Sequence, residues 1–287
     1  MRFSDSLSST LPQLIASDLD GTLLPRGGTF FPQDIETLHR LGEKGVVRAI
    51  VTGRNLHFAR EAIPLDFPID YLVFSSGAGI VHWPECTMLF AENLAPQQTE
   101  QIVHTLHRER LNFMIHRTIP GEHRFYFEQN YEDCGDFTHR LNAHRNWGTP
   151  LGEADPKNIP ASQALAFIPV NESRFLEIKR VLPDVKVIRT SSPFGREEIW
   201  IEIFPLHISK GAAVHWLCDK LHFDMRRTMS IGNDYNDIDL LDTTAQSFIV
   251  SSAPHELRQR YIVTPEEAGI SWAVKNITAF QSEEKNH

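Results

Sequence analysis

The chain has 287 residues, of which 41% are hydrophobic and 23% charged, and this composition favours a globular protein over a disordered or fibrous one. That length is enough for one large domain or two modest ones. The formal net charge of −9 disfavours a nucleic-acid-binding protein, because such proteins depend on Lys and Arg for their contacts with phosphates.

The first 88 residues alternate between strands and helices. Apolar, β-branched runs predict strands at residues 14–17, 46–51 and 71–75. Apolar residues at helical spacing predict helices at residues 32–44 and 58–62. This alternation is typical of a parallel sheet with helices on both faces.

Between residues 89 and 204 the pattern changes, because several strands follow one another without a helix between them. The predicted strands are residues 112–116, 124–128, 165–170, 185–189 and 198–204. The predicted helices are residues 97–110, 131–144 and 174–182, with a loop at 146–160. Adjacent strands favour a mixed or antiparallel sheet, and we expect an α+β domain inserted into the first domain.

The alternating pattern returns near residue 209. The remaining predictions are a helix from 209 through 217, a strand at 228–231, a helix opening at 238–241, strands at 248–250 and 261–263, and a helix at 266–277. The predicted fold is therefore α/β, with a doubly wound parallel-sheet core at residues 1–88 and 205–287 and the inserted domain at 89–204.

Three cysteines, Cys86, Cys134 and Cys218, are far apart and show no metal-binding spacing, so we expect reduced thiols and a cytoplasmic location. The N-terminus lacks the layout of a signal peptide. No apolar run approaches the ~20 residues that span a bilayer. We expect no membrane and no nucleic-acid partner, and either a monomer or a small homo-oligomer.

The pattern Asp18-Leu19-Asp20-Gly21-Thr22 directly follows the first predicted strand. Open α/β sheets bind ligands at the carboxyl ends of their strands. Two carboxylates held together there repel each other unless a cation or a proton intervenes. We therefore predict a metal-assisted site in which one aspartate attacks and the other moves protons. Plain turn residues are the alternative, but the complete pattern is too specific to favour it.

Three further clusters stand at element ends. Thr52-Gly53-Arg54 follows the second strand, where a hydroxyl and backbone N–H groups either hold phosphate oxygens or only form a turn. Lys210 falls in the first turn of a helix, where the dipole disfavours a cation, so either an anion lies nearby or the side chain is solvated. Residues 232–237 (Gly-Asn-Asp-Tyr-Asn-Asp) suit Mg2+ better than an Asx-rich turn alone.

In this order the four clusters resemble the motifs of the haloacid dehalogenase (HAD) superfamily of phosphatases, most closely its Cof-type (type IIB) branch, which has a large α/β cap inserted between the second and third motifs. The resemblance covers nearly the whole chain and implies a Rossmann-like core. It implies catalytic roles for Asp18, Asp20, Thr52 and Lys210. It implies substrate binding by Gly21, Thr22, Gly53, Arg54 and Asn236. It implies a Mg2+ ion held by Asp18, Asp20, Asn233, Asp234 and Asp237, with Asp20 offering its backbone carbonyl.

The fourth motif departs from the branch, which usually has Gly-Asp-x-x-Asn-Asp. Here Asn233 occupies the first acidic position, and Asp234 comes one residue later. Either the amide oxygen of Asn233 or the carboxylate of Asp234 could ligate the ion. Losing one formal charge beside Mg2+ should weaken its binding.

The resemblance implies a Mg2+-dependent phosphomonoester hydrolase acting on a small phosphorylated metabolite, with a sugar phosphate as the family expectation. Asp18 would form an aspartyl-phosphate, and Asp20 would protonate the leaving oxygen and then deprotonate water. The cap, hinged near residues 84–92 and 204–207, would exclude water. Two alternatives stay open: a phosphomutase or phosphotransferase of the same superfamily, and a non-catalytic phospholigand-binding protein.

Overall fold

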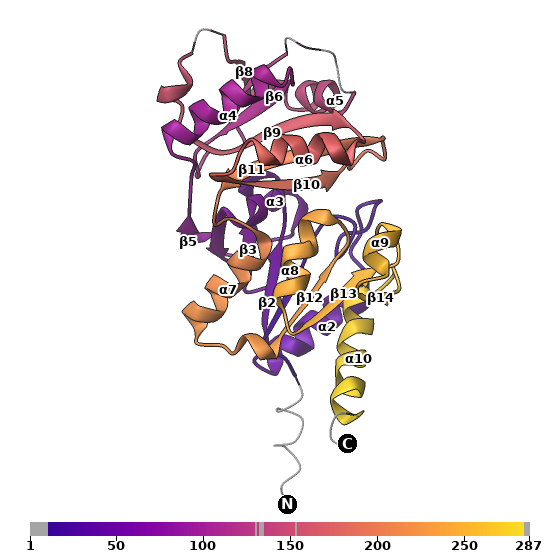
Figure 1. The fold of residues 1–287 in the computed structure, drawn as a ribbon. Coiled ribbons are helices and arrows are strands. Elements are labelled where there is room, and N and C mark those ends of the chain that lie inside the picture. The colour runs from indigo at the N-terminus through magenta and orange to yellow at the C-terminus, as the bar shows by residue number, and fades with distance from the viewer. Residues whose placement is uncertain (1–10, 130, 132–134, 153, 284–287) are drawn as a thin grey trace, which may run out of the picture. The chain divides into compact units, whose positions relative to one another are not determined.

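A computed structural model describes residues 11–129, 131, 135–152 and 154–283 (Figure 1). The chain forms two compact units. Unit 1 comprises Met1–Gly53, Ala62–Leu89 and Lys210–His287, and unit 2 comprises Arg54–Glu61 and Phe90–Ser209. The domain limits at 88/89 and 204/205 stay a prediction. Nothing in the sequence indicates that Arg54–Glu61 belongs to unit 2.

Unit 1 is built on an eight-stranded sheet. Its strands, in spatial order, are β14 (Ile262–Thr264), β13 (Gln246–Val250), β12 (Thr228–Gly232), β1 (Leu14–Ser17), β2 (Val47–Val51), β3 (Tyr71–Phe74), β4 (Gly79–His82) and β5 (Thr87–Ala91). The strands from β14 to β3 are parallel, and β4 is antiparallel to β3. In register, Ser17 lies between Ile231 and Ile50, so β1, β12 and β2 reach the same edge of the sheet together.

The chain order reverses at β1, because β2 and β3 extend the sheet on one side of it and β12, β13 and β14 on the other. Right-handed crossovers then place helices on both faces, and Figure 1 shows α8 in front of the sheet. Helices α2 and α10 pack together, as do α7 and α8. The helices of unit 1 are α2 (Pro32–Glu43), α7 (Lys210–Leu221), α8 (Ile238–Thr243), α9 (His255–Arg258) and α10 (Gly269–Glu283). Ligand sites of open α/β folds lie at such a reversal, outside the carboxyl ends of the strands.

Unit 2 contains a six-stranded sheet. Its strands, in spatial order, are β10 (Val185–Ser191), β11 (Glu198–Pro205), β9 (Ala161–Pro169), β6 (Phe113–Arg117), β7 (Phe125–Glu128) and β8 (Gly148–Pro150). Helices α4 (Pro96–Arg108) and α6 (Glu172–Arg180) supply Ile102, Leu106 and Ile178 to the core on one face. Helix α5 (Gly135–Ala143) covers part of the other face with Phe137 and Leu141. This unit also holds α3 (Leu56–Ala62) except for its last residue.

Short 3-10 turns complete the assignment: η1 (Ser75–Gly77), η2 (Arg145–Trp147), η3 (Pro156–Asn158), η4 (Met225–Arg227) and η5 (Tyr235–Asp237). The predicted fold class, a doubly wound α/β core with an inserted α+β region, is confirmed.

Several local predictions were wrong. Strands β4 and β5 and helix α9 were not expected, and the loop predicted at 146–160 contains β8 and η3. Strand β5 lies at the sheet edge with mostly exposed side chains, so it lacks the alternation that predicts a strand. The helix predicted at 131–144 begins at Gly135 instead, and residues 132–134 lie outside the described part.

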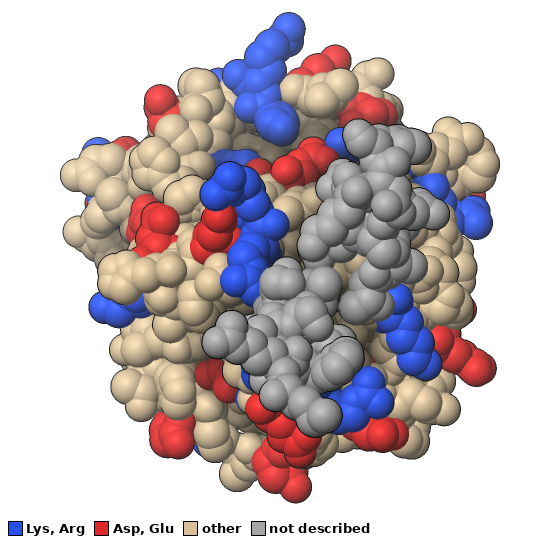
Figure 2. Space-filling model, turned by 90° about the horizontal axis from the view of Figure 1, so that it is seen from below, with Lys and Arg blue, Asp and Glu red and all other residues tan. Residues whose placement is uncertain are grey.

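Three further features concern the expectations about membranes, nucleic acids and cysteines. Within the part of the chain that the structure describes, no helix is both long and apolar enough to cross a bilayer. On the face drawn in Figure 2, basic and acidic side chains are interspersed, unlike the basic stripe typical of a nucleic-acid interface. Cys218 is a buried free thiol, and Cys134 lies outside the described residues.

Candidate active site

The first motif begins where β1 ends. The backbone N–H of Asp18 donates to the carbonyl of Ile231 on β12 (2.9 Å), which holds Asp18 between the two central strands. The residue is only 4% exposed, whereas Asp20 is exposed. A buried strand therefore delivers one shielded carboxylate and one solvent-accessible carboxylate to the edge of the sheet.

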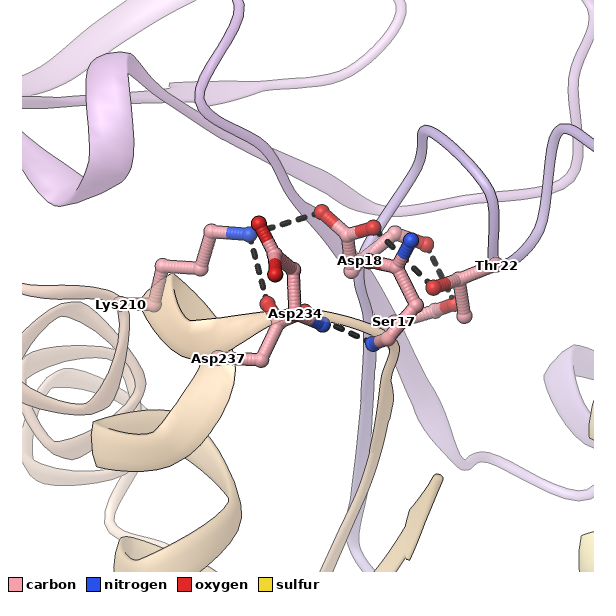
Figure 3. A network of polar contacts seen from close by, with 7 residues as sticks. Ser17, Asp18, Thr22, Lys210, Asp234 and Asp237 are labelled. Carbon is pink, nitrogen blue, oxygen red and sulfur yellow. Dashed lines mark hydrogen bonds and ion pairs between the residues drawn. The ribbon is translucent and has the colours of Figure 1, made fainter. Parts of the chain in front are cut away.

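Lys210 opens α7 and contacts two carboxylates (Figure 3). Its Nζ donates to Oδ1 of Asp18 (2.7 Å) and to Oδ1 of Asp237 (2.6 Å). Because the side chain is 1% exposed, a solvated lysine is excluded. The anions that explain a cation in the first turn of a helix are thus the aspartates of the first and fourth motifs.

The Asp18 carboxylate is oriented through both of its oxygens. Oδ1 accepts from Lys210, and Oδ2 accepts from the hydroxyl of Thr22 (3.1 Å). Thr22 was predicted to bind substrate, but its hydroxyl contacts Asp18 here. The hydroxyl of Ser17, which the sequence did not single out, donates to the Asp18 carbonyl (2.7 Å).

Asp237 is completely buried and engaged at both carboxylate oxygens. Oδ1 accepts from Lys210, and Oδ2 accepts from the backbone N–H groups of Asn233 (2.8 Å) and Asp234 (3.1 Å). These contacts close the turn after β12 and position Lys210. They favour a positioning role for Asp237 over the metal-ligand role predicted for it.

Asn233 lies against the first motif. Gly21 has a φ of +78°, which L side chains rarely adopt, and a Cβ there would come within 2.4 Å of Nδ2 of Asn233. The Asn233 amide therefore approaches the loop that follows Asp20. Asp234 is 9% exposed, and Figure 3 shows its carboxylate directed toward Lys210 and Asp18. Both candidate ligands of the fourth motif belong to this site.

Burial and charge determine the protonation of the central groups. Burial raises the pKa of Asp18 to about 7; the negative charge of Asp237 adds to this effect, and Lys210 opposes it. Burial alone would lower the pKa of Lys210, but the carboxylates of Asp18 and Asp237 outweigh burial and raise it. Lys210 is therefore firmly protonated, and the site carries more negative than positive charge.

This excess of carboxylate charge fits Mg2+. The carboxylates of Asp18 and Asp237 contact the Lys210 ammonium, that of Asp234 is directed toward it in Figure 3, and that of Asp20 lies close enough to act on Asp18. Among the described residues, no group of three His, Cys, Asp or Glu side chains is arranged to hold a metal by itself. Mg2+ does not need such a cage, because it keeps several waters and takes one or two carboxylates.

The second motif lies at the same edge of the sheet. Thr52 follows β2, is 1% exposed, donates its backbone N–H to Val73 (2.9 Å) and accepts from the N–H of Ser76 (3.0 Å). Ser75 and Ser76 both have a positive φ beside it. This Ser-Ser-Gly segment follows a strand, where its composition predicts a turn but no functional role.

The other predicted substrate-binding residues are less centrally placed. Gly53 ends the first segment of unit 1, but Arg54 belongs to unit 2 and donates from Nη1 to the carbonyl of Phe58 (3.2 Å). Asn236 lies half-buried in the η5 turn with Asp237. The structure therefore groups Asp18, Lys210 and residues 233–237 closely, and places Thr52 and Gly53 one strand away.

Comparison with known proteins agrees with this geometry. A family model described as haloacid dehalogenase-like hydrolase matches residues 15–273. An "HMP-PP phosphatase" of Klebsiella pneumoniae (strain 342) is 25% identical over 254 residues, which cover 86% of this chain and 87% of that protein. Its namesake from Cronobacter sakazakii is 26% identical over 249 residues, with the same coverage.

Solved structures share the fold over almost the whole chain. A phosphatase of the HAD superfamily from Bacteroides thetaiotaomicron has a TM-score of 0.76 at 14% identity, covering 96% of this chain and 98% of its own. A sugar phosphatase of HAD subclass IIB has a TM-score of 0.71 at 17% identity, covering 94% and 99%. At these identities the likeness shows the fold.

Proposed function

Since the chain belongs to the haloacid dehalogenase-like hydrolase family and is a phosphatase, we propose that it is a Mg2+-dependent phosphomonoester hydrolase working through an aspartyl-phosphate at Asp18. The observation that carries this proposal is the buried Lys210 ammonium shared between Asp18 and Asp237. It supplies the positive charge that lets a carboxylate approach a phosphate dianion.

Asp18 is the proposed nucleophile. One of its carboxylate oxygens attacks phosphorus in line, a new P–O bond forms, and the P–O bond to the leaving group breaks with its electron pair on the leaving oxygen. Thr22 and Lys210 hold the carboxylate so that little reorientation is needed before attack. Lys210 also offsets charge on the transferring group.

Asp20 is the proposed acid and base. It donates a proton to the leaving oxygen, and its carboxylate then takes a proton from the water that attacks phosphorus and breaks the bond to Asp18. Its exposure suits this role, because both the leaving group and the water must reach it. Asp20 also lies close enough to Asp18 to raise the pKa of that carboxyl.

The proposed ion site is formed by Asp18 and by Asn233 or Asp234, with the backbone carbonyl of Asp20. Bound Mg2+ supplies charge neutralisation at the phosphoryl oxygens. Asp237 positions Lys210 and the 233–237 turn rather than meeting the ion. Thr52 and Gly53 hold phosphate oxygens from the end of β2.

The proposed substrate is a small phosphorylated metabolite. The relatives named HMP-PP phosphatase and the structural neighbour named a sugar phosphatase support this class. We assign choice of the leaving group to the inserted region, proposed at 89–204, because the motifs of the core are assigned here to the phosphate and the ion.

The test is hydrolysis of p-nitrophenyl phosphate with Mg2+, with and without excess chelator. We expect inorganic phosphate as the product, loss of turnover in chelator and recovery when Mg2+ is restored. Transfer of phosphate to an added alcohol would instead indicate a phosphotransferase. Turnover that persists unchanged in chelator would contradict the metal dependence.

A further inference from the structure

The turn of the fourth motif, residues 233–237, is attached to a second element of unit 1 besides α7. Strands β12 and β13 are parallel, and Gly232 pairs with Ile249, so the chain leaves both strands at the same edge of the sheet. The segment after β13 then forms α9. The hydroxyl of Tyr235 in the turn donates to Oε1 of Glu256 on α9, and we call this contact the Tyr235–Glu256 bond.

Helix α9 is a firm support for the Tyr235–Glu256 bond. Ala253 and Leu257, which lie on either side of Glu256 in the chain, are 5% and 2% exposed. Both belong to an apolar cluster with Ile249 of β13, and the Tyr235 ring packs against this cluster. Because buried, closely packed side chains resist displacement, α9 offers the turn a rigid point of attachment.

The residues just before Tyr235 are the two candidate ligands of the proposed ion, Asn233 and Asp234. The Asp234 carboxylate is directed toward Lys210 and Asp18 (Figure 3). Asp234 and Tyr235 share one planar peptide unit, so a side chain fixed at residue 235 restricts the rotations that would carry the Asp234 carboxylate out of the site. The Tyr235–Glu256 bond therefore acts on the part of the turn that faces the proposed ion.

Rigidity of this turn matters more here than in a site with a full set of acids. Asn233 stands where the branch usually has an aspartate, so one formal charge is missing beside the proposed ion. The affinity of an oxygen-ligand site depends both on its charge and on its rigidity, so firm placement of the remaining oxygens offsets part of the missing charge. If only a fraction of the molecules hold the binding conformation, the apparent dissociation constant rises in inverse proportion to that fraction.

We propose that Tyr235 and Glu256 are positioning residues of the Mg2+ site, whose hydrogen bond holds the 233–237 turn in the conformation that presents its ligand to the ion. The proposal rests on the magnesium-dependent function proposed above. In this role the two side chains act through the turn and do not meet the ion. Linkage makes the effect reciprocal: if the bond favours Mg2+ binding, bound Mg2+ must strengthen the bond by the same factor.

The first test measures Mg2+ binding without substrate, by isothermal titration calorimetry, in wild type, Tyr235→Phe and Glu256→Ala. Tyr235→Phe keeps the ring for the apolar cluster and removes only the hydroxyl. We expect each variant to raise the dissociation constant of Mg2+ about 3–10-fold, the range for one lost hydrogen bond. The double variant should raise it no further, because both substitutions remove the same bond.

Glu256→Gln separates the hydrogen bond from the charge of Glu256. The glutamine oxygen can still accept from Tyr235, so this variant should bind Mg2+ within about twofold of wild type. A loss as large as that of Glu256→Ala would show an effect of charge and overturn the proposal. Tyr261→Phe is the matched control, because Tyr261 packs against the same apolar cluster but donates its hydroxyl to Asp242 of α8 (2.7 Å). It should leave Mg2+ binding unchanged, and a shift equal to that of Tyr235→Phe would also overturn the proposal.

Urea unfolding distinguishes a positioning role from a purely structural one. A purely structural bond would cost Tyr235→Phe the same stability in chelator and in saturating Mg2+. A bond coupled to the ion should cost more in Mg2+, and the additional loss should match the change in dissociation constant found by titration. Equal losses in both conditions, or unchanged Mg2+ affinity in Tyr235→Phe, would overturn the proposal while leaving the proposed function intact. A wild type that binds no Mg2+ would refute the proposed function and this proposal with it.

Discussion

Replacement of Lys210 by Met removes the buried ammonium that Asp18 and Asp237 share while keeping the length of the side chain. Removing one partner of a buried ion pair typically costs about 3–5 kcal/mol, because the opposite charge is left buried. Here two carboxylates lose the same partner. We expect the free energy of unfolding to fall by at least ~3 kcal/mol at about pH 8 in chelator.

The loss of stability in Lys210→Met should be smaller at low pH than at high pH. Burial raises the pKa of Asp18 to about 7 even with Lys210 opposing it, so the pKa rises further without Lys210. A carboxyl whose folded-state pKa lies above its unfolded value of about 3.9 stabilises the fold when protonated, and that contribution is lost as pH rises toward the folded-state pKa. The variant should therefore lose less relative to wild type at about pH 5 than at about pH 8.

Urea unfolding, followed by tryptophan fluorescence, measures the free energy of unfolding of wild type and variant at both pH values. Lys220→Met, an exposed lysine of the same α7 helix, is the control and should leave stability nearly unchanged. Adding Asp237→Asn to Lys210→Met should restore part of the loss, because one unpaired charge is removed. Equal losses at both pH values, or a loss in Lys220→Met as large as in Lys210→Met, would refute the reasoning.

Three further substitutions probe the neighbours of this ion pair. Asn233→Asp should tighten Mg2+ binding in a fluorescence titration, and an unchanged titration would assign the ligand role to Asp234. Thr22→Val removes the hydrogen bond to Asp18. It should lower kcat about 10–100-fold with little change in KM, which is the range expected for losing a hydrogen bond to a charged group. An unchanged kcat would contradict the orienting role of Thr22. Gly21→Ala places a Cβ at a residue with a φ of +78°, within 2.4 Å of Nδ2 of Asn233. It should lower the free energy of unfolding by about 1–3 kcal/mol and weaken Mg2+ binding. Wild-type values for both quantities would show that the loop accommodates the methyl group without strain.

The sequence predicted the core of the site because the determinants are local. An apolar strand that ends in Asp18-Leu19-Asp20-Gly21-Thr22 places its carboxylates at a sheet edge. Inferring this position requires no information about contacts between distant residues. The helix predicted from residue 209 followed from helical spacing, and α7 begins one residue later, at Lys210. These inferences needed only periodicity and short connections.

The ion pair between Lys210 and Asp237 could not be predicted from periodicity and local connections. It depends on α7 packing closely on α8, where a Cβ on Gly211 would come within 2.5 Å of the carbonyl of Asp239. The separation of 27 residues gives no sequence signal for this approach. Asp237 was accordingly predicted as a metal ligand rather than as the partner of Lys210.

Unit 2 was harder for a similar reason. His116 and Gln163 occupy ordinary strand positions, and only the register of β6 with β9 brings them together. Strand β8 spans Gly148–Pro150, a segment with turn-forming residues, and it forms because β7 offers it a partner. Tertiary pairing, not local preference, determines these features.

The central claim is that Asp18 accepts the phosphoryl group. The most direct measurement is mass spectrometry of the peptide containing Asp18 after acid quenching of a reaction with p-nitrophenyl phosphate and Mg2+. Wild type and Asp20→Asn should both carry a phosphate-sized mass increase on Asp18, larger in Asp20→Asn because hydrolysis is slowed, and Asp18→Asn should carry none and turn nothing over. Phosphate on another residue, or near-normal turnover by Asp18→Asn without a phosphoenzyme, would contradict the account.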